Sequence, residues 1–389
     1  MSSVGIDQIS FYTSNHFLDL RTLASAHKID PEKYYLGIGQ EKMAMAAHDE
    51  DIVTMAASAA APLFKDESSK IISTLLFATE TSIDQSKSAG VYVHRLLGLH
   101  ENCRVVELKQ ACYSATAAVQ MACALVSREP SSTVLVIASD IAKYDLDSPG
   151  EATQGCGAIA MLIRANPKIL TIDPHVGNYT EDVMDFWRPN YRNTPIVDGK
   201  YSTKIYLKSL KKAWENFCQS SHLEFNDFQH FCYHLPFSRM GQKAHRHLAK
   251  INKCPLQMAD IDAQTQHSLI YNKLLGNSYA AALFIGFTSL IENHPSDLAG
   301  QKIGFFSYGS GCVAEFFSGT IVQGYQEHLF SDEHRVMLEK RNELTYDEYL
   351  ALYTVPDPQE GESVVFAPDT TGRFRLAKIS DHKREYVQS

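Results

Sequence analysis

Short runs of apolar residues recur along the chain, with stretches typical of helices between them. Apolar runs bounded by polar or turn residues predict buried strands at 71–78 (IISTLLFA), 105–108, 134–138, 158–163, 303–307 and 313–317. Helical segments are predicted at 116–127, 206–219, 241–250 and 279–293. The first four strands alternate with helices, which indicates βαβ units around a mostly buried sheet and an α/β fold class.

The last part of the chain, from Gln326 onward, is richer in charged residues. It predicts surface helices and a final β-hairpin around 369–379 (DTTGRFRLAKI).

One arrangement occurs twice along the chain. In the first half a strand ends in TET at 79–81, and a helix of small residues begins near Cys112 (CYSATAAVQMACAL). In the second half a strand ends in FCYHLPF at 231–237, and another small-residue helix follows Asn277. This repetition favours a duplicated core with a junction near 166–167, although many α/β proteins share the pattern. We therefore expect an N-terminal half at 1–167 and a C-terminal half at 168–389.

Composition excludes several classes of protein. Apolar residues make up 44% of the 389 residues and charged residues 21%, which excludes a disordered or fibrous protein. The net charge of -9 argues against nucleic acid as a partner. No apolar segment approaches the ~20 residues of a membrane helix, since the longest candidate, at 280–287, is too short. The N-terminus does not have the pattern of a signal peptide.

The 8 cysteines form no CxxC or CxxH cluster, so the sequence predicts no metal site and no disulfide framework. Such cysteines in a long chain are typical of reduced thiols in the cytoplasm. The sequence also contains no P-loop and no GxGxxG motif, so nothing points to ATP or a dinucleotide.

Cys112 is the first candidate for catalysis. It follows the apolar run VVELKQ and opens a helix of small residues. A thiol at a helix N-terminus lies near the positive end of the helix dipole and near free N–H groups, which favours the nucleophilic thiolate. A buried, inert cysteine is the alternative interpretation, and we apply it to the remaining cysteines.

Two further candidates lie at the carboxyl ends of predicted strands, where α/β sheets place their sites. His234, in FCYHLPF, is a residue type that exchanges protons near neutral pH. Glu80 closes the run STLLFATE, and a desolvated carboxylate there has a raised pKa and can act as a base. A histidine bonded to backbone, and a salt bridge of Glu80 with Lys87 or Arg95, are the alternatives.

Three other features suit a bound substrate. The turn at 308–311 (YGSG) offers backbone N–H groups to an oxyanion, together with the N–H of Cys112, although a plain hairpin turn is commoner. Asn277 is either an N-cap or a hydrogen-bond donor to a thioester carbonyl. A basic stretch suits the phosphates of a nucleotide-like cofactor or forms a solvated helix face. It contains Arg239, Lys243, His245, Arg246, His247, Lys250 and Lys253.

Several of these residues lie in stretches that resemble the hydroxymethylglutaryl-CoA synthase family of the mevalonate pathway, in its short bacterial form. The resemblance runs from about Gly5 to the C-terminus and is loose over roughly the last 60 residues. The matching stretches, in order, are IDPEKYYLGIGQ (29–40), FATETSIDQSKS (77–88), LKQACYSATAA (108–118), ASDIAKY (138–144), MDFWRPNY (184–191), DGKYSTKIYLKSL (198–210), YHLPFSRMGQKA (233–244), YNKLLGNSYAAALF (271–284) and FSYGSGCVAEFF (306–317). ACYSATAA alone indicates only the thiolase-like superfamily, and Glu80 with Cys112 and His234 narrows the resemblance to this family.

The resemblance implies a thiolase-like, five-layered αβαβα core of two duplicated halves, each with a five-stranded sheet, in a homodimer. It implies that acetyl-CoA acetylates Cys112, and that Glu80 then removes a proton from the acetyl methyl group. The carbanion attacks the ketone of acetoacetyl-CoA, with His234 as the acid near that carbonyl. Water finally releases 3-hydroxy-3-methylglutaryl-CoA and CoA. No metal or other cofactor is expected, and the expected location is the cytoplasm.

Further residue roles follow from the resemblance alone. The positions that match substrate- or CoA-binding residues are Asp30, Thr153, Ser202, Lys243, Asn277 and Ser310. The positions that match supporting residues are Asp84, Tyr113, Asp140, Asp185 and Tyr308. The chain departs from the family pattern at Ser114, where Gly is usual, at Ala152, where Pro is expected, and at Cys156, where Ala is expected. We expect these departures to touch the pocket wall, which leaves the acyl preference open.

Three other functions are compatible with these residues. A ketosynthase uses Cys, His and Asn, which Cys112, His234 and Asn277 supply, but it needs no carboxylate base because loss of CO₂ generates its carbanion. A β-branching enzyme of polyketide assembly performs the same condensation on a carrier protein, and the basic stretch near Lys243 suits an acidic carrier. A non-catalytic thiolase-fold scaffold is the third, and the intact Cys112, Glu80 and His234 argue against it.

Overall fold

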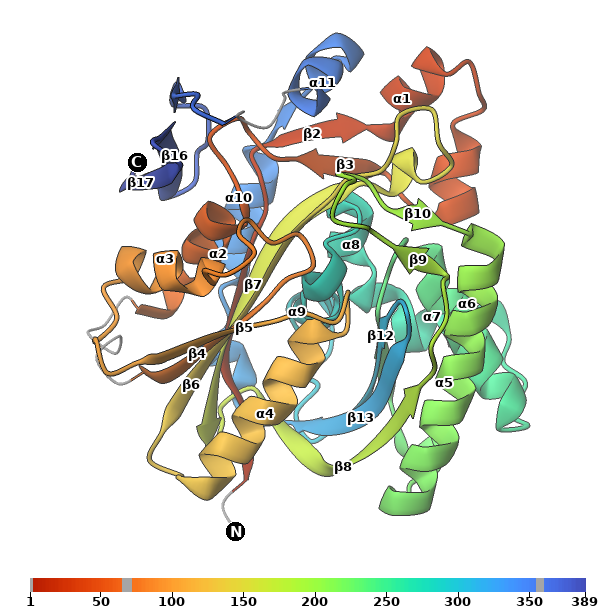
Figure 1. Cartoon of the computed structure of the whole chain (residues 1–389). Helices are drawn as coiled ribbons and strands as arrows, with labels where there is room; N and C mark the ends of the chain where they lie inside the picture. Colours follow the sequence, from red (N-terminus) through yellow and green to blue (C-terminus); the bar gives the residue numbers. More distant parts are fainter. Residues whose placement is uncertain (1–2, 65–71, 355–359) are drawn as a thin grey trace.

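Strands from both halves of the chain meet in one nine-stranded sheet at the centre of the molecule (Figure 1). The computed structural model describes residues 3–64, 72–354 and 360–389. Across the sheet the strand order is β11-β12-β13-β8-β1-β7-β6-β4-β5. The bounds of these strands are β1 Val4–Tyr12, β4 Ile72–Ala78, β5 Arg104–Leu108, β6 Thr133–Ala142, β7 Gly155–Ala165, β8 Leu170–Thr180, β11 His230–Tyr233, β12 Lys302–Gly309 and β13 Val313–Ile321.

The sheet consists of two parts with the same plan. In the first half of the chain β4 is parallel to β5 and β6, and β6, β7 and β1 then pair antiparallel. In the second half β11 is parallel to β12, and β12, β13 and β8 then pair antiparallel. The parts join where Gly5 and Ile6 of β1 pair with Thr171 and Leu170 of β8. A Cβ at Gly5 would lie 1.9 Å from the Leu170 carbonyl oxygen, so the junction requires glycine.

Helices cover the outer faces of the two parts and fill the space between them. α2 (Ile52–Ala60) and α3 (Ala89–Leu96) pack on the first part. α5 (Gly199–Ser221) and α6 (Arg239–Ile251) pack on the second. α4 (Ser114–Arg128) and α9 (Ala282–Asn293) share one core cluster with β6, β7, β12 and β13, so they lie between the two parts. The five-layered αβαβα core of two duplicated halves expected from the sequence is therefore confirmed.

The two central helices differ in their apolar surface because they differ in their surroundings. α4 buries a stripe at helical spacing, which includes Ala115, Ala118, Val119, Ala122 and Val126, and leaves its other side partly open. α9 is buried at every position from 282 to 291, as a helix enclosed by other elements must be. The small-residue runs that mark both helices in the sequence therefore reflect the crowded central layer.

The apolar runs predict the buried strands and helices well but miss two strands in the middle of the sheet. Each predicted strand and helix is present, most with ends displaced by a few residues, and Ile71 lies outside the described residues. The largest difference is at α5, which begins at Gly199 and not at residue 206. β1 carries Asp7 and Gln8 among apolar residues, and β8 carries Pro174 and His175, so neither forms an apolar run. Pro174 is tolerated because the register of β8 against β13 shifts there and β8 has already left β1.

The second part of the sheet holds four strands, not the five that the resemblance implies. The place of β5 in the duplicated plan corresponds to residues 252–257 (NKCPLQ), between α6 and α7 (Met258–Thr265), and these residues form no strand. Pro255 lacks a backbone N–H to donate to a neighbouring strand, which disfavours pairing at this edge.

The C-terminal part contains the expected surface helices, α10 (Ser331–Glu339) and α11 (Tyr346–Tyr353), and a hairpin of β16 (Phe374–Ser380) and β17 (Lys383–Gln388). The hairpin begins later than predicted because residues 369–372 form a loop. The Asp49 carboxylate holds this loop by accepting hydrogen bonds from the N–H groups of Asp369 and Thr370. A local turn pattern cannot reveal a partner so far away in the chain.

Small sheets and short helices complete the periphery. They include β2 (His16–Asp19), α1 (Leu20–Ala26), β3 (Lys42–Met45), β9 (Phe186–Trp187), β10 (Ile196–Val197), α8 (Ile270–Leu275), β14 (Asn342–Glu343) and β15 (Val364–Val365). Among the described residues, no helix is both long and apolar enough to cross a membrane.

Candidate active site

Cys112 lies in a tight turn that joins β5 to α4. The preceding residue, Ala111, has a left-handed backbone conformation (φ 43°), which is strained for a residue with a side chain. The turn meets the tip of the β12–β13 hairpin (Figure 1), where a Cβ at Gly309 would lie 2.5 Å from the Gln110 carbonyl oxygen and 2.7 Å from the Tyr113 Cβ. Gly309 therefore allows the second half of the chain to approach the turn of the first half.

Cys112 and Glu80 are in direct contact. The Cys112 thiol donates a hydrogen bond to Glu80 Oε2, with 3.2 Å between the sulfur and the oxygen. Glu80 lies just beyond the end of β4, and the two residues are buried, with 9% of Glu80 and 8% of Cys112 exposed. The parallel pairing of β4 with β5 thus brings a thiol and a carboxyl group into one water-poor site.

Asp140, near the end of β6, fixes the loop that carries Glu80. Its Oδ1 accepts hydrogen bonds from the N–H groups of Glu80 and Thr81 and from the hydroxyls of Thr79 and Thr81. Its Oδ2 accepts a hydrogen bond from the N–H of Ala280, just before α9. The Asp140 carboxylate is fully buried. Because it accepts hydrogen bonds from Glu80 in the first half and Ala280 in the second, it connects the two halves behind Glu80.

Burial sets the proton affinities of the contacting pair. Desolvation, followed by the charge of Asp140, raises the pKa of Glu80 from 4.5 to about 8. The hydrogen bond from Cys112 and the charge of Arg188 lower it by smaller amounts. Burial and the adjacent Glu80 also raise the pKa of Cys112 well above its ordinary value. The expected thiolate is therefore wrong for the resting site, because desolvation and a neighbouring carboxyl group outweigh the helix dipole.

His234 occupies the place in the second half that Glu80 occupies in the first, directly after a parallel strand. The backbone N–H of His234 donates a hydrogen bond to the Phe306 carbonyl, and the backbone carbonyl of His234 accepts one from the Tyr206 hydroxyl. Both distances are 2.8 Å. Its Nδ1 is buried with no hydrogen-bond partner, and burial lowers the pKa of the ring to about 3. The imidazole is therefore neutral at neutral pH. In the described part of the chain, no hydrogen bond joins its side chain to Cys112 or Glu80.

Four side chains beside the pair are missed by the sequence analysis. Tyr144, Phe186 and Tyr279 pack with Cys112 in one buried cluster, with ring centroids 5.9 Å to 6.3 Å apart. Arg188, just after β9, donates a hydrogen bond to the Glu80 carbonyl. Phe186 and Arg188 have a signal in the sequence, the run FWR directly after Asp185, where aromatic rings and a cation adjoin a carboxylate. Tyr144 and Tyr279 lie outside this run. These rings exclude water from the thiol.

Asp185 holds the tip of the β12–β13 hairpin. Its Oδ2 accepts hydrogen bonds from the Tyr308 hydroxyl at 2.6 Å and the Ser202 hydroxyl at 3.0 Å. Its Oδ1 accepts a hydrogen bond from the Gly311 N–H at 2.9 Å. That N–H is already engaged, so the expectation that the whole turn at 308–311 faces an oxyanion is wrong for Gly311. Ser202 and Tyr308 position Asp185 in this structure.

Backbone and side-chain hydrogen bonds also hold Asn277 and Thr153 in place beside each other. The Asn277 Oδ1 accepts a hydrogen bond from the Tyr279 N–H at 2.9 Å, and the Asn277 N–H donates to the Thr153 carbonyl at 3.1 Å. The Thr153 hydroxyl donates to the Gly150 carbonyl. The side-chain oxygen of Asn277 thus accepts a cap-like bond, and its Nδ2 is the atom that can donate to a thioester carbonyl.

The other candidates lie farther out. Asp30, Asp84 and Lys243 are exposed, and Ser310 is half-buried. The Asp84 carboxylate accepts two backbone N–H bonds within its own loop, which lowers the pKa of this group. The structure therefore does not bring these four residues into contact with Glu80 or Cys112.

The departures from the family pattern are less close to the pocket than expected. Cys156 packs in the core between the sheet and α2, and Ala152 packs in a cluster with Tyr349. Neither belongs to the cluster around Cys112. Ser114 lies beside the turn, fully buried, and its hydroxyl has no hydrogen-bond partner. Only Ser114 is thus adjacent to the nucleophile.

The basic stretch on α6 is smaller than the sequence indicates. His245 is fully buried, with its Nδ1 at 2.9 Å from the Tyr233 hydroxyl and its Nε2 at 2.6 Å from Gln264 Oε1. Burial lowers the pKa of His245 to about 4, so it adds no charge to the surface. Lys243 is exposed, and its ammonium lies 5.1 Å from the centre of the Phe237 ring.

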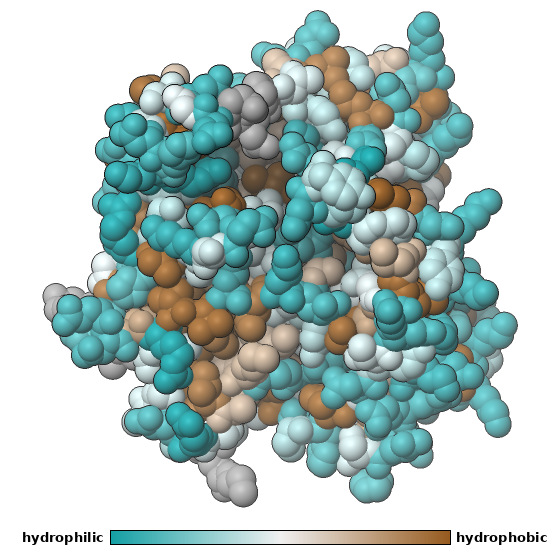
Figure 2. All heavy atoms as spheres, viewed as in Figure 1, coloured by the Kyte–Doolittle hydropathy of each residue, from teal (hydrophilic) through white to brown (hydrophobic). Residues whose placement is uncertain are grey.

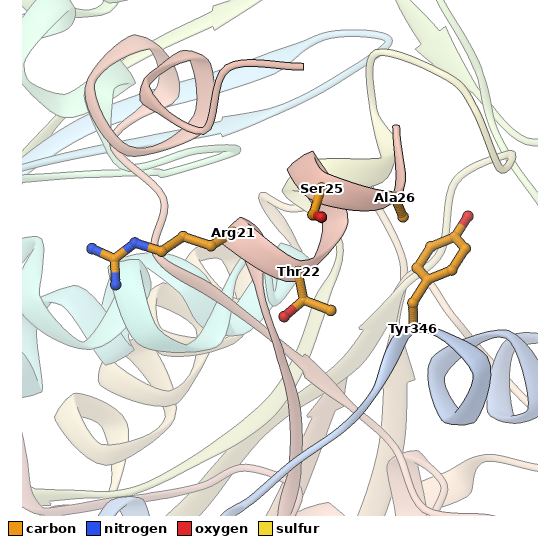
Figure 3. A pocket seen from close by; sticks show the side chains of 5 residues that line it. All are labelled: Arg21, Thr22, Ser25, Ala26 and Tyr346. Atoms are coloured by element: carbon orange, nitrogen blue, oxygen red, sulfur yellow. The ribbon is translucent and has the colours of Figure 1, made fainter. Parts of the chain in front are cut away.

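Two further features lie outside the cluster around Cys112. His27, Asp147 and Glu151 place potential metal-binding atoms within 4.8 Å of one another. The Glu151 carboxylate already accepts hydrogen bonds from the Tyr349 hydroxyl and the Asp147 N–H. An open pocket nearby is lined by Arg21, Thr22, Ser25, Ala26 and Tyr346 (Figure 3). Neither feature contains a catalytic candidate.

Comparison with known proteins finds relatives along most of the chain. The family model for the N-terminal part of hydroxymethylglutaryl-coenzyme A synthase matches residues 1–168, and the C-terminal model matches 170–254 and 248–357. A hydroxymethylglutaryl-CoA synthase of Enterococcus faecalis is 43% identical over 90% of this chain and 91% of its own length. A polyketide biosynthesis 3-hydroxy-3-methylglutaryl-ACP synthase of Bacillus subtilis is 33% identical over 91% of this chain and 88% of its own.

A solved structure agrees with these matches. The crystal structure of a hydroxymethylglutaryl-CoA synthase complexed with CoA has a TM-score of 0.94 and 39% sequence identity, and the match covers 100% of both chains. The thiolase-like fold class expected from the sequence is thereby confirmed.

Replacing Glu80 with glutamine should stabilise the folded protein at neutral and alkaline pH. Because burial raises the pKa of Glu80 from 4.5 to about 8, the native state keeps a proton that the unfolded chain releases in this range. The free energy of unfolding therefore falls as the pH rises through this range. We expect Glu80→Gln to gain roughly 1–3 kcal/mol above pH 8 and less toward pH 5, measured by thermal unfolding. Equal melting temperatures for the two proteins at every pH would contradict this.

Proposed function

The chain belongs to the hydroxymethylglutaryl-CoA synthase family, and from this premise we propose how its active site works. Its reaction is the condensation of acetyl-CoA with acetoacetyl-CoA and water, which gives 3-hydroxy-3-methylglutaryl-CoA and CoA in the mevalonate pathway. We assign Cys112 as the nucleophile, Glu80 as the base and His234 as the group that polarises the ketone. The buried hydrogen bond between the Cys112 thiol and Glu80 Oε2, at 3.2 Å, carries the assignment.

In the first stage Cys112 is acetylated. Its proton passes to Glu80 Oε2 as the sulfur attacks the carbonyl carbon of acetyl-CoA. The bond between that carbon and the CoA sulfur then breaks, and Glu80 returns the proton to the leaving thiolate. The contact between the two side chains supports this order, since it gives the thiol proton an acceptor in a site where burial opposes a free thiolate.

In the second stage Glu80 removes a proton from the methyl group of acetyl-Cys112. A C–H bond beside a thioester is weakly acidic, so the base must be desolvated and held close to it. The raised pKa of Glu80 and the anchoring of its backbone by Asp140 support that role. The carbanion attacks the ketone carbon of acetoacetyl-CoA and forms the new C–C bond.

His234 stabilises the charge that develops on the ketone oxygen during this attack. Burial lowers the pKa of the ring to about 3, so the group that meets the substrate is a neutral imidazole. Its role is then to donate a ring N–H hydrogen bond to the oxygen, from a position that Tyr206 and Phe306 hold rigid. The oxygen becomes the hydroxyl of the product by taking up the proton that Glu80 removed from the methyl group, which returns Glu80 to its carboxylate form.

In the last stage water attacks the thioester carbon on Cys112, frees the product and restores the thiol. The nucleophile, the base and the hydrogen-bond donor are all side chains of this chain. We therefore propose that the reaction uses CoA thioesters as substrates and needs no metal or redox cofactor.

A second candidate is the same condensation on a carrier protein. The relative from Bacillus subtilis, whose name is that of an ACP synthase, favours it. The exposed basic face of α6 around Lys243 suits either the phosphates of CoA or an acidic carrier. Turnover of free acetoacetyl-CoA without a carrier protein decides for the CoA enzyme, and turnover only of a carrier-bound substrate decides against it.

We also propose that two copies of the chain associate along β5. This strand is the edge of the nine-stranded sheet, and Val106 on it is 40% exposed, while Met121 on α4 is 49% exposed. Figure 2 shows hydrophobic side chains gathered over this part of the molecule. An unpaired strand edge with apolar residues favours pairing with another edge.

The eight cysteines are all free, which supports a reducing compartment such as the cytoplasm.

The association predicts that a charge on β5 weakens the dimer. Light scattering on the purified protein should give twice the mass of one chain, and Val106→Lys should shift it toward the mass of a single chain. Val365→Lys, which changes a side chain that is 76% exposed elsewhere, should leave the mass unchanged. A dimer that Val106→Lys leaves intact would mean that the interface lies elsewhere.

The catalytic roles predict different defects for two variants. Cys112→Ala should neither take up an acetyl group from acetyl-CoA nor turn over. Glu80→Gln should still accept the acetyl group, at a reduced rate, but condense it with acetoacetyl-CoA on the order of a thousandfold more slowly. Intact-protein mass spectrometry follows the adduct, and release of CoA follows turnover. Near wild-type condensation by Glu80→Gln would show that another group is the base.

The role of Glu80 as a base predicts a pH dependence. Only the carboxylate form can take a proton, and the pKa of Glu80 is raised to about 8. The rate at saturating substrate should therefore increase with pH up to about 8 and level off above it. A rate that is constant from pH 6 to pH 9 would contradict the role, once product release has been shown not to limit turnover.

A further inference from the structure

Glu315 is a buried carboxylate that the mechanism above does not use. It lies in the middle of β13, with 2% of its surface exposed. No salt bridge reaches it within the described residues, and burial raises its pKa to about 7. A buried acidic group without a cationic partner destabilises the fold, so its presence calls for a compensating role.

The two oxygens of Glu315 both hold α4. Oε2 accepts a hydrogen bond from the Tyr113 hydroxyl at 2.7 Å. Oε1 accepts one from Gln120 Nε2, also at 2.7 Å. Tyr113 is the residue that follows Cys112 and precedes the first residue of α4. A strand of the second half therefore holds the helix start that carries the nucleophile of the first half.

The turn around Cys112 needs such a restraint. Ala111 has a positive φ of 43°, a conformation that persists only when the surroundings enforce it. The turn's own bonds are few: the Tyr113 N–H donates to the Gln110 carbonyl and the Ser114 N–H to the Ala111 carbonyl, at 3.1 Å and 3.3 Å. The Tyr113 side chain adds a further restraint, because its hydroxyl reaches β13 and donates a hydrogen bond to Glu315 there.

We propose that Glu315 is a positioning residue for Cys112, which it acts on through the Tyr113 hydroxyl. The bond fixes Tyr113, the turn then keeps its strained shape, and the Cys112 sulfur stays in line with Glu80. Glu315 does not touch the reacting atoms. The inference rests on the proposed role of Cys112 as the nucleophile.

Four variants test this positioning. Glu315→Ala and Tyr113→Phe should each slow the acetylation of Cys112 by acetyl-CoA on the order of tenfold to a hundredfold, because small displacements of a reacting atom are costly. The double variant should be no slower than the slower single one, since both remove the same bond. Glu315→Gln can still accept a hydrogen bond from Tyr113, so it should stay within about threefold of wild type. Rapid-quench mass spectrometry of the acetyl adduct gives these rates.

A matched control separates positioning from general stability. Glu292 is another buried carboxylate, which accepts a hydrogen bond from the Tyr271 hydroxyl at 2.6 Å and lies 2.8 Å from His334 Nδ1. It lies near the C-terminal end of α9, whereas Cys112 packs near the N-terminal end of that helix, against Tyr279. Glu292→Ala should lower the melting temperature but leave acetylation within about threefold. An equal slowing by Glu292→Ala at an equal loss of stability would overturn the inference, as would wild-type acetylation by Glu315→Ala.

Backbone hydrogen exchange tests the inference without relying on the reaction. In Glu315→Ala the amides of residues 110–116 should exchange at least tenfold faster than in wild type, and in Glu292→Ala they should not. Unchanged exchange in Glu315→Ala would overturn the inference even if the enzyme is active. A wild-type protein that does not acetylate at all would instead overturn the proposed function, and the exchange data would still decide on Glu315.

Discussion

The active site depends on keeping one carboxyl group out of water beside one thiol. Glu80 and Cys112 share a hydrogen bond in a buried site, and the same burial raises the pKa of both groups. A base that must remove a proton from carbon gains from desolvation, whereas the folded state loses stability from it. The surrounding residues make sense as restraints on this costly arrangement. Asp140 anchors the Glu80 loop, and an aromatic cluster excludes water from the sulfur.

The duplicated fold supplies two versions of the same framework, and the two halves place different chemistry on it. Glu80 follows β4 and His234 follows β11, the corresponding parallel strands. Cys112 precedes α4, and Asn277 precedes α9, the two helices of the central layer. The hairpin of the second half then reaches across to the turn of the first half at Gly309. The turn that carries Cys112 therefore depends on contacts from the second half, whereas His234 is held by Tyr206 and Phe306 of its own half.

The local sequence pattern predicts the elements whose burial shows as a run of apolar residues. It does not predict features that depend on residues far away in the chain. Apolar runs predict β4, β5, β6, β7, β12 and β13. They do not predict β1 and β8 in the middle of the sheet, because β1 carries polar residues and β8 carries polar residues and a proline. The end of a predicted strand singles out Glu80 and the start of a small-residue helix singles out Cys112, yet neither pattern shows that the two side chains touch. Burial, and after it the contact with Glu80, raises the pKa of Cys112 and so reverses the expected ionisation of the thiol. His245 looks like part of a basic face and is in fact buried against Tyr233.

The most direct test of this account is the ionisation of Glu80 itself. Infrared difference spectra across a pH titration, with the Glu80→Gln protein as the reference, isolate the carboxyl band of this one residue. Burial beside Cys112 predicts that the protonated band disappears with a midpoint near pH 8. A midpoint near 4.5, the ordinary value for glutamate, would contradict the claim that a water-poor site sets the proton affinity of the base.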